Sequence, residues 1–404
     1  MKQKGLDKFF EDFLERKSIF LDKKYLQANF TPDNVPHRNE QIQQIANILA
    51  PALKLEKPSN LFMYGKTGTG KTLTVKFVTN NLIKVSKNKN IPLKIIYLNC
   101  KLKKVADTEY RLIAQISKEL GQELPPTGLP TDEVYKIVFN LFDKEKSVIL
   151  ITLDEIDQLV KKTGDEVLYN LIRINSELKN SQVSIVGISN NLFFRDHLED
   201  PRVRNSLSEE EVLFQPYNAL QLQDILNQRA EKSFEKGVVG MGVIEKCAAY
   251  AAREHGDARR ALELLRVAAE IAERNGQEQI TLHNIDEAEE KTEKDKVLEI
   301  VNMQPKQQQA VLFSIISLEG SKDDKIFTGE VYEVYKKVCL KAGVRPLTQR
   351  RVSDILFEFD MLGLINTKVI SKGRYGRTRD ISISIPKSTE QKIKKVLEEG
   401  LGLA

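Results

Sequence analysis

One stretch of eight residues has the composition and spacing to bind phosphate groups. It lies between a short apolar run, Leu61–Tyr64, and a helical pattern from Thr72 to Val85, which is the strand–loop–helix context that such a loop needs. Glycines let the backbone curl until several N–H groups point into one cavity, and the start of the following helix attracts anions. We predict that Lys71 contacts the β- and γ-phosphates of ATP or ADP and that Thr72 binds Mg²⁺. The pattern G-x-x-x-x-G-K-[ST] is matched by Gly65, Lys66, Thr67, Gly68, Thr69, Gly70, Lys71 and Thr72.

Two acidic residues follow the apolar run Val148–Leu153. A carboxylate at the end of a central strand, beside a phosphate-binding loop, gives Mg²⁺ an oxygen ligand. We predict that Asp154 binds the metal, directly or through its water, and that Glu155 polarises the attacking water. The alternative is a pair of solvated acids at a strand end.

Two further polar residues are candidates for the γ-phosphate. Asn190 ends the apolar run Val183–Ile188, while its neighbour Asn191 is equally suited to capping a helix. Arg259 begins a later helix after Gly256 and would fold back on the γ-phosphate; the alternative is Asp257 as a helix cap followed by solvated arginines. Such a set hydrolyses ATP by positioning and charge neutralisation.

Strands and helices must alternate to position these residues. Near-continuous apolar strands separated by helices predict a parallel sheet covered by helices on both faces, the α/β architecture of P-loop domains. Residues 1–30 should form a helical, charged arm. Strands are expected at 61–64, 95–98, 148–153 and 183–188, and helices at 39–53, 72–85, 106–120, 131–143 and 165–178.

Beyond Tyr217 the pattern changes twice. Residues 219–295 are helical in pattern, with breaks at 237–242 and at Gly256, which predicts a separate helical lid domain. Three further helices, at 306–318, 328–341 and 347–362, precede two strands at 365–371 and 379–385, the order of a winged helix-turn-helix domain. We therefore expect three domains, at 1–215, 216–300 and 301–404.

The C-terminal domain carries the positive charge of the chain. Residues 305–404 contain 18 Lys and Arg against 12 Asp and Glu, whereas the whole chain has a net charge of +5. A basic winged helix with an acid-free wing predicts contact with double-stranded DNA. The alternatives are a solvated basic surface and a protein-binding module. The candidate DNA contacts are Arg345, Gln349, Arg350, Arg351, Lys372, Arg374, Tyr375, Arg377 and Arg379.

The remaining composition is that of a cytoplasmic protein. No run of eighteen apolar residues occurs, so no membrane span or membrane partner is expected, and the charged N-terminus has no apolar signal core. The three cysteines and four histidines are scattered without metal-ligand spacing. With a DNA-binding domain, the expected place is the nucleoid.

These motifs together resemble a known family, the archaeal origin-recognition and helicase-loader AAA+ initiators. The resemblance covers residues 15 to 390, and its most specific parts are PHR near the N-terminus, FQPY, GDARRALELL and the winged helix. The loop GKTGTGKT and the motif ILITLDEID are common to all AAA+ proteins. The other matching motifs are GISNN, DPRVRNSL and FQPYNALQLQDIL.

The resemblance implies roles that spacing alone does not give. Pro36, His37 and Arg38 would line the adenine pocket, with Val35 and Tyr217 also in the nucleotide site, and it supports Arg259 as a sensor of the γ-phosphate. Residues 101–147 lie where these initiators carry a DNA-contacting insertion, with the loop 125–130 as the candidate contact or a plain surface loop.

One part of the family pattern differs. The segment 200–204 lies where AAA+ proteins present an arginine to a neighbour's nucleotide, which makes Arg202 or Arg204 a candidate. Clamp-loader subunits have Ser-Arg-Cys there, whereas this chain has Asn205, Ser206 and Leu207.

Three functions fit the sequence to different degrees. The first is an ATP-dependent replication initiator that binds origin DNA, hydrolyses ATP slowly, and assembles on DNA with other initiator paralogues or recruits the replicative helicase. The second is an ATP-gated transcription regulator. The third is a motor-type protein remodeller, which the missing Ser-Arg-Cys motif disfavours.

Overall fold

The computed structural model describes residues 18–27, 30–32, 34–101, 108–125, 128–198, 200–207, 209–319, 326–371, 377–385 and 387–403. The chain forms two compact units that divide between residues 285 and 286. Within the described residues, no helix is both long and apolar enough to cross a membrane.

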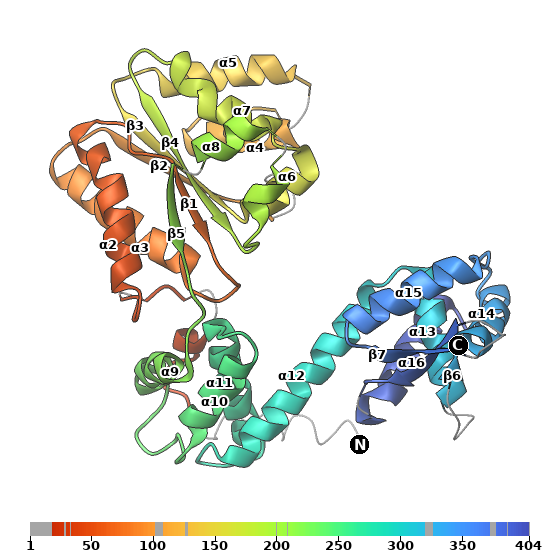
Figure 1. Ribbon diagram of the computed structural model, residues 1–404. Coiled ribbons are helices and arrows are strands. Elements are labelled where there is room, and N and C mark those ends of the chain that lie inside the picture. The colour runs from red at the N-terminus through yellow and green to blue at the C-terminus, as the bar shows by residue number, and fades with distance from the viewer. Residues whose placement is uncertain are drawn as a thin grey trace, which may run out of the picture. The chain divides into compact units, whose positions relative to one another are not determined.

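A five-stranded parallel sheet forms the centre of the first unit (Figure 1). Its order, β2-β3-β4-β1-β5, places β1 and β3, the strands that lead into the phosphate-binding loop and the two acids, on either side of β4. The predicted parallel sheet is confirmed, although β5 was not expected because only Val212 of its four residues is buried. The strands are β1 Leu61–Tyr64, β2 Leu93–Asn99, β3 Val148–Asp154, β4 Gln182–Ser189 and β5 Glu210–Leu213.

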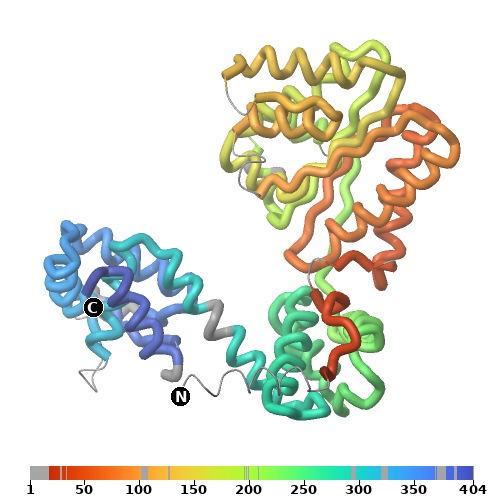
Figure 2. The backbone as a smooth tube through the Cα atoms, turned by 180° about the vertical axis from the view of Figure 1, so that it is seen from behind, coloured from red at the N-terminus to blue at the C-terminus, as the bar shows by residue number. Residues whose placement is uncertain are grey.

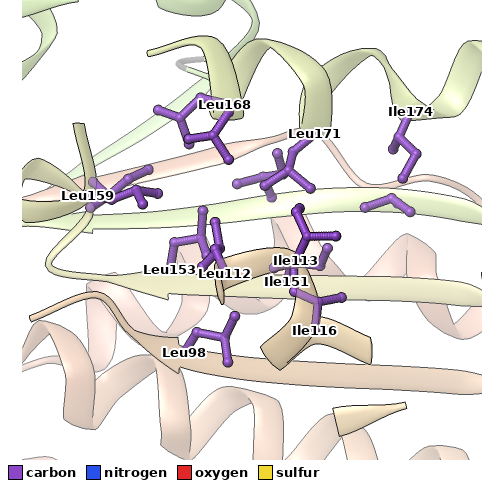
Figure 3. Close-up of a cluster of buried hydrophobic side chains, with 14 of the residues drawn as sticks. Leu98, Leu112, Ile113, Ile116, Ile151, Leu153, Leu159, Leu168, Leu171 and Ile174 are labelled. Carbon is purple, nitrogen blue, oxygen red and sulfur yellow. The ribbon is translucent and has the colours of Figure 1, made fainter. Parts of the chain in front are cut away.

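Helices cover both faces of this sheet, as predicted. One face of the sheet packs against α2 and α3. The other face packs against α4, α6 and α7, and buried leucines and isoleucines of these helices and of the strands form a cluster there (Figure 3). These helices are α2 Asn39–Leu49, α3 Lys71–Asn88, α4 Glu109–Glu119, α5 Thr131–Phe142, α6 Ile156–Thr163, α7 Glu166–Arg173 and α8 Pro201–Leu207.

Two helices end earlier than predicted. The helix expected at 39–53 stops at Leu49, because Pro51 lacks the N–H that an α-helix needs, and Ala50–Lys54 form the 3-10 helix η3. The helix expected at 165–178 ends at Arg173, where the 3-10 helix η4, Ile174–Ser176, begins. The helix α6 was not predicted.

A helical bundle follows the sheet in the same unit. It contains α9 Ala219–Ser233, α10 Val243–Arg253 and α11 Ala258–Arg274, and α12 Leu282–Met303 begins within it. Asn218 and Gln221 form a capping box at α9, and Asp257 caps α11. The predicted helical lid is therefore present.

The N-terminal arm packs on this lid (Figure 2). The prediction of a helical arm is wrong over residues 18–27, where only the 3-10 helix η2, Lys23–Leu26, forms. Ile19, Phe20 and Leu26 are buried, and the backbone N–H of Leu21 donates to the carbonyl of Ser233 at 2.8 Å. Contact with the lid thus decides the conformation of the arm.

The second unit is the predicted winged helix. Three helices pack with a sheet of order β6-β8-β7, whose strand pairs are both antiparallel and whose strand β6 lies between the first and second helices in the chain. The strand β6 and the helix α16 were not expected; α16 buries only Ile393, Leu397 and Leu401 of its apolar residues. The elements are α13 Lys306–Glu319, β6 Ile326–Phe327, α14 Thr328–Lys341, α15 Gln349–Met361, β7 Ile365–Ser371, β8 Arg377–Ile383 and α16 Lys387–Leu401.

Candidate functional site

The phosphate-binding loop requires glycine for reasons of space as well as conformation. Gly68 and Gly70 have φ angles of +72° and +90°, which side-chain-bearing residues rarely adopt. A Cβ at Gly68 would lie 1.7 Å from Oδ1 of Asp257. The backbone N–H of Ala258 also donates to the Gly68 carbonyl at 3.3 Å, so the first turn of α11 rests on the loop.

Lys71 lies at the start of α3 and is almost fully buried. Its ammonium donates to the carbonyl oxygens of Gly65 and Lys66, at 2.7 and 2.9 Å. Burial lowers the pKa of Lys71 to about 8, although the negative charge of Asp154 works in the opposite direction. A buried cation among backbone dipoles is well suited to meet phosphate oxygens.

Asp154 ends β3 and is held by three donors. Its Oδ2 accepts the hydroxyl of Thr72 at 2.8 Å and the hydroxyl of Tyr97, while its Oδ1 accepts the backbone N–H of Glu155 at 3.0 Å. The carboxylate is nearly inaccessible to solvent. The structure therefore joins the two predicted metal ligands, Thr72 and Asp154, by a direct hydrogen bond.

Glu155 follows with a left-handed backbone, at φ 56° and ψ 45°. For a residue with a side chain this conformation costs roughly 1–2 kcal/mol, so the surroundings must hold it. Desolvation raises the pKa of its carboxyl above the ordinary value, and Lys101, whose Nζ lies 3.9 Å from Oε2, opposes this shift. The side chain borders the same cavity as Asp154.

Arg38 connects three parts of the site. Its Nε donates to the Thr69 carbonyl at 2.9 Å, and its Nη2 donates to the Gln215 carbonyl at 2.6 Å. The guanidinium also lies 3.8 Å from the centre of the Tyr217 ring. The neighbouring His37 has a φ of 60°, and its Nε2 lies 3.0 Å from Oδ2 of Asp224 on α9.

A cavity of about 840 Å³ opens between the loop, the arm and the lid. Most of the predicted nucleotide-site residues line it together. Five do not: Gly65, Lys66, Thr67, His37 and Arg38 lie behind or beside the lining, and Lys66 instead approaches His255 at 3.4 Å. Those that line it are Gly68, Thr69, Gly70, Lys71, Thr72, Val35, Pro36, Asp154, Glu155, Asn190, Tyr217 and Arg259.

The sequence did not point to several other lining residues. The lining residues of α9 recur at helical spacing, so they lie on one face of that helix, and this spacing could have been read from the sequence. The lining residues of the arm follow no such spacing. Arg229 stands out because its Nη1 is buried without a hydrogen-bond partner and its guanidinium lies 4.6 Å from the centre of the Phe30 ring. The additional residues are Gln27, Phe30, Thr31, Pro32, Asn34, Leu73, Lys76, Tyr97, Asn99, Ile225, Gln228, Arg229, Lys232, Ala258 and Leu262.

In the second unit, the residues predicted to contact DNA gather around the start of α15. Arg345, Gln349, Arg350 and Arg351 are all exposed, and Thr348 caps the helix by accepting from the Arg351 N–H. Arg379 is different, because its Nη1 donates to the Ser353 carbonyl at 3.0 Å and so ties β8 to α15. Lys372, Arg374 and Tyr375 lie outside the described residues, as does the side chain of Arg377 at the start of β8.

The candidate loop 125–130 joins the region after α4 to α5. Tyr110 donates to the Pro125 carbonyl at 2.6 Å, while residues 126 and 127 lie outside the described part.

Of the two candidate trans-acting arginines, Arg202 is the exposed one. It pairs with Asp200 at 2.8 Å and lies over the Tyr169 ring. Arg204 turns inward to the Leu198 carbonyl, at 2.6 Å.

Three family models match successive parts of the chain. Residues 55–193 match an AAA domain, residues 223–290 the Cdc6 AAA+ ATPase-type lid domain, and residues 299–392 the CDC6 C-terminal winged helix domain. These three regions correspond to the sheet, the lid and the winged helix described above.

Curated relatives match over nearly the whole chain. The ORC1-type DNA replication protein of Pyrococcus abyssi is 53% identical over 399 residues, which cover 98% of this chain and 94% of the relative. ORC1-type DNA replication protein 1 of Methanosarcina mazei is 49% identical, covering 97% and 94%. Among solved structures, the Aeropyrum pernix ORC1 protein in complex with DNA has a TM-score of 0.81 and 42% identity, covering 95% of this chain and 98% of that one. The chain therefore belongs to the ORC1/Cdc6 family of DNA replication initiators, which are AAA+ ATPases with a lid and a C-terminal winged helix.

Proposed function

We propose that the protein binds origin duplex DNA and that slow hydrolysis of bound ATP switches its state for helicase recruitment. The observation that carries the proposed ATP-dependent switch is the composition of the nucleotide cavity. Its walls come from the phosphate-binding loop, the N-terminal arm and the lid helices α9 and α11 together. A ligand that fills the cavity touches all three, so a change from ATP to ADP alters the contacts between them.

The donor groups fit a nucleotide with Mg²⁺. The loop offers backbone N–H groups at the start of α3 and the buried ammonium of Lys71, which match phosphate. Thr72 and Asp154 offer hard oxygen atoms, and Mg²⁺ prefers such ligands and takes the rest from phosphate and water. When bound, the metal would neutralise charge on the β- and γ-phosphates.

The remaining residues have separate tasks in hydrolysis. Glu155 would orient and polarise the attacking water, Asn190 would hydrogen-bond the γ-phosphate or this water, and Arg259 would sense the γ-phosphate from the lid. Arg259 lies in the first turn of α11, whose cap Asp257 lies against Gly68, so movement of the lid would shift the phosphate-binding loop.

The winged helix supports binding to double-stranded DNA. Exposed Arg345, Gln349 and Arg350 surround the start of α15, where side chains reach base edges and phosphates in such domains. The Aeropyrum pernix relative was solved in complex with DNA. Double-stranded DNA is therefore the proposed partner, and a nucleoid-associated cytoplasmic location follows from it.

Genome-wide occupancy in synchronised cells tests the proposal. Peaks at sites where replication starts, lost in an Arg374→Ala, Arg377→Ala double variant, would support an origin-binding initiator. Peaks spread over promoters, with none at replication starts, would instead support an ATP-gated transcription regulator. Co-purification with helicase subunits or with initiator paralogues, in ATP but not in ADP, tests the proposed recruitment and assembly on DNA.

A further inference from the structure

The hydroxyl of Tyr97 reaches the same carboxylate oxygen as Thr72. Oδ2 of Asp154 accepts from both hydroxyls, and Oδ1 accepts from the backbone N–H of Glu155. Each oxygen of the buried carboxylate therefore has a protein donor. Such charge-assisted hydrogen bonds fix the rotation of the carboxylate as well as its position.

The register of the sheet brings Tyr97 to this place. In the parallel pair of β2 and β3, Asn99 lies opposite Asp154 and Tyr97 lies opposite Thr152. Because side chains alternate along a strand, Tyr97 and Asn99 share one face, and both border the nucleotide cavity. Tyr97 lies two residues before Asn99, which pairs with Asp154, and the phenol side chain is long enough to cover the distance between these two positions.

The helix α3 contacts the ring of Tyr97 through Lys76. Thr72 and Lys76 are four residues apart on α3, so they lie on the same side of the helix. The Lys76 ammonium lies 4.3 Å from the centre of the Tyr97 ring, a distance at which the cation is attracted to the ring face. Tyr97 thus connects β2, β3 and α3 at the point where the metal ligands meet.

We propose that Tyr97 is a positioning residue for the Mg²⁺ site: its hydroxyl holds Asp154 in the rotation in which Oδ2 faces the Thr72 hydroxyl, so that both groups are oriented to hold the metal. This inference rests on the proposed Mg²⁺-nucleotide binding and extends it to a residue outside the motifs. Since Asp154 is a carboxylate, the phenol acts as a donor. Without that donor the carboxylate rotates more freely and presents its oxygens less often in the required direction.

The test compares two tyrosines of the same domain, one partly buried at position 97 and one buried at position 135. Tyr97→Phe removes only the hydroxyl at the metal site. Tyr135→Phe is the matched control, because the Tyr135 hydroxyl donates to Oε1 of Glu109 at 2.6 Å, away from the nucleotide cavity. Binding of ADP to the full chain is measured by calorimetry, once with Mg²⁺ and once with EDTA.

The expected result is specific to the metal. Tyr97→Phe should weaken ADP binding roughly tenfold in Mg²⁺, the size expected for one hydrogen bond to a charged group, and leave binding in EDTA within about twofold of wild type. Tyr135→Phe should change neither value. An equal loss in Mg²⁺ and in EDTA, or an unchanged affinity in Mg²⁺, would overturn the role of Tyr97.

The two proposals fail in different ways. If wild-type protein binds ADP equally well in Mg²⁺ and in EDTA, the metal site itself fails, and the role of Tyr97 fails with it. If wild type gains affinity from Mg²⁺ and Tyr97→Phe gains as much, only the inference about Tyr97 fails. Should Tyr97→Phe not fold, Lys76→Met keeps the hydroxyl but releases the ring. A smaller loss confined to Mg²⁺ then supports the inference, and an equal loss in EDTA contradicts it.

Discussion

Arg38 donates a hydrogen bond from its Nε to the carbonyl oxygen of Thr69, at 2.9 Å, inside the phosphate-binding loop. The two residues are 31 positions apart, and the same guanidinium also holds the chain at Gln215, where the sheet domain ends. The residue thus stabilises the loop from behind rather than lining the nucleotide cavity. We therefore propose that Arg38 supports the loop, in addition to the place in the adenine pocket that the family resemblance implies.

Replacing Arg38 by alanine should lower the free energy of unfolding by about 3 kcal/mol, because the buried Thr69 carbonyl and the Gln215 carbonyl both lose a charged donor. Chemical denaturation followed by circular dichroism measures the change. Arg202→Ala is the control. Arg202 forms an exposed pair with Asp200, and its loss should cost less than about 1 kcal/mol. Equal effects of the two substitutions would contradict the supporting role of Arg38.

Affinity for ADP should fall as the pH rises above 8. Burial lowers the pKa of Lys71 to about 8, and bound phosphate favours the charged ammonium. Below pH 8 the cation is already present in the free protein, whereas above it a proton must be taken up on binding, at a cost of up to about tenfold in affinity per pH unit. Calorimetry between pH 7.5 and 9.5 measures this slope.

The matching variant for this slope is Lys71→Met, which lacks the titrating group. It should bind weakly at every pH and show no decline in this interval. A slope as steep as that of wild type would assign the effect to another group.

Glu155→Gln should reduce ATP hydrolysis by at least about a hundredfold, the usual contribution of a positioned general base. Binding of ATP should change little, because the amide keeps the shape of the side chain. A steady-state phosphate assay beside an equilibrium binding measurement separates the two. The exposed Glu56 of the same domain provides the control, Glu56→Gln, with activity like wild type. Parallel loss of binding and hydrolysis in Glu155→Gln would argue against a catalytic role.

Gly256→Ala should destabilise the lid more than Gly276→Ala does. Both glycines have positive φ angles, +67° and +70°, so the conformational penalty of about 1 kcal/mol is shared. Only at Gly256 would the new Cβ meet a neighbour, the Tyr217 carbonyl oxygen at 2.3 Å. The difference in melting temperature between the two variants therefore reports this close approach, and identical melting temperatures would exclude it.

Arg350→Ala should weaken DNA binding and reduce the slope of log K against log salt by roughly 0.9, if Arg350 replaces one counterion. Fluorescence anisotropy with duplex DNA between 50 and 200 mM salt gives the slope. Lys336→Ala removes the same charge from α14, where Lys336 pairs with Glu333, and serves as the control. A slope that both substitutions leave unchanged would place the DNA contact elsewhere.

Local sequence determined the chemistry of the nucleotide site. Gly68, Gly70 and Lys71 lie within one loop, and Asp154 and Glu155 are adjacent at the end of a strand, so their roles follow from short-range geometry. The parallel sheet, the lid and the winged helix also followed from hydrophobic periodicity. The helix α16 escaped prediction because only three of its residues form the apolar stripe.

Tertiary structure alone decided which distant residues complete the site. Tyr97 reaches Asp154 only because β2 pairs with β3 in one register, and Arg38 reaches Thr69 only because the arm leads into α2 beside the loop. The arm itself lacks the expected helix over residues 18–27, since contact with the lid buries Ile19, Phe20 and Leu26 in another conformation. Contacts between segments far apart in the chain depend on packing and strand register, and the hydrophobic pattern of a single segment predicts neither.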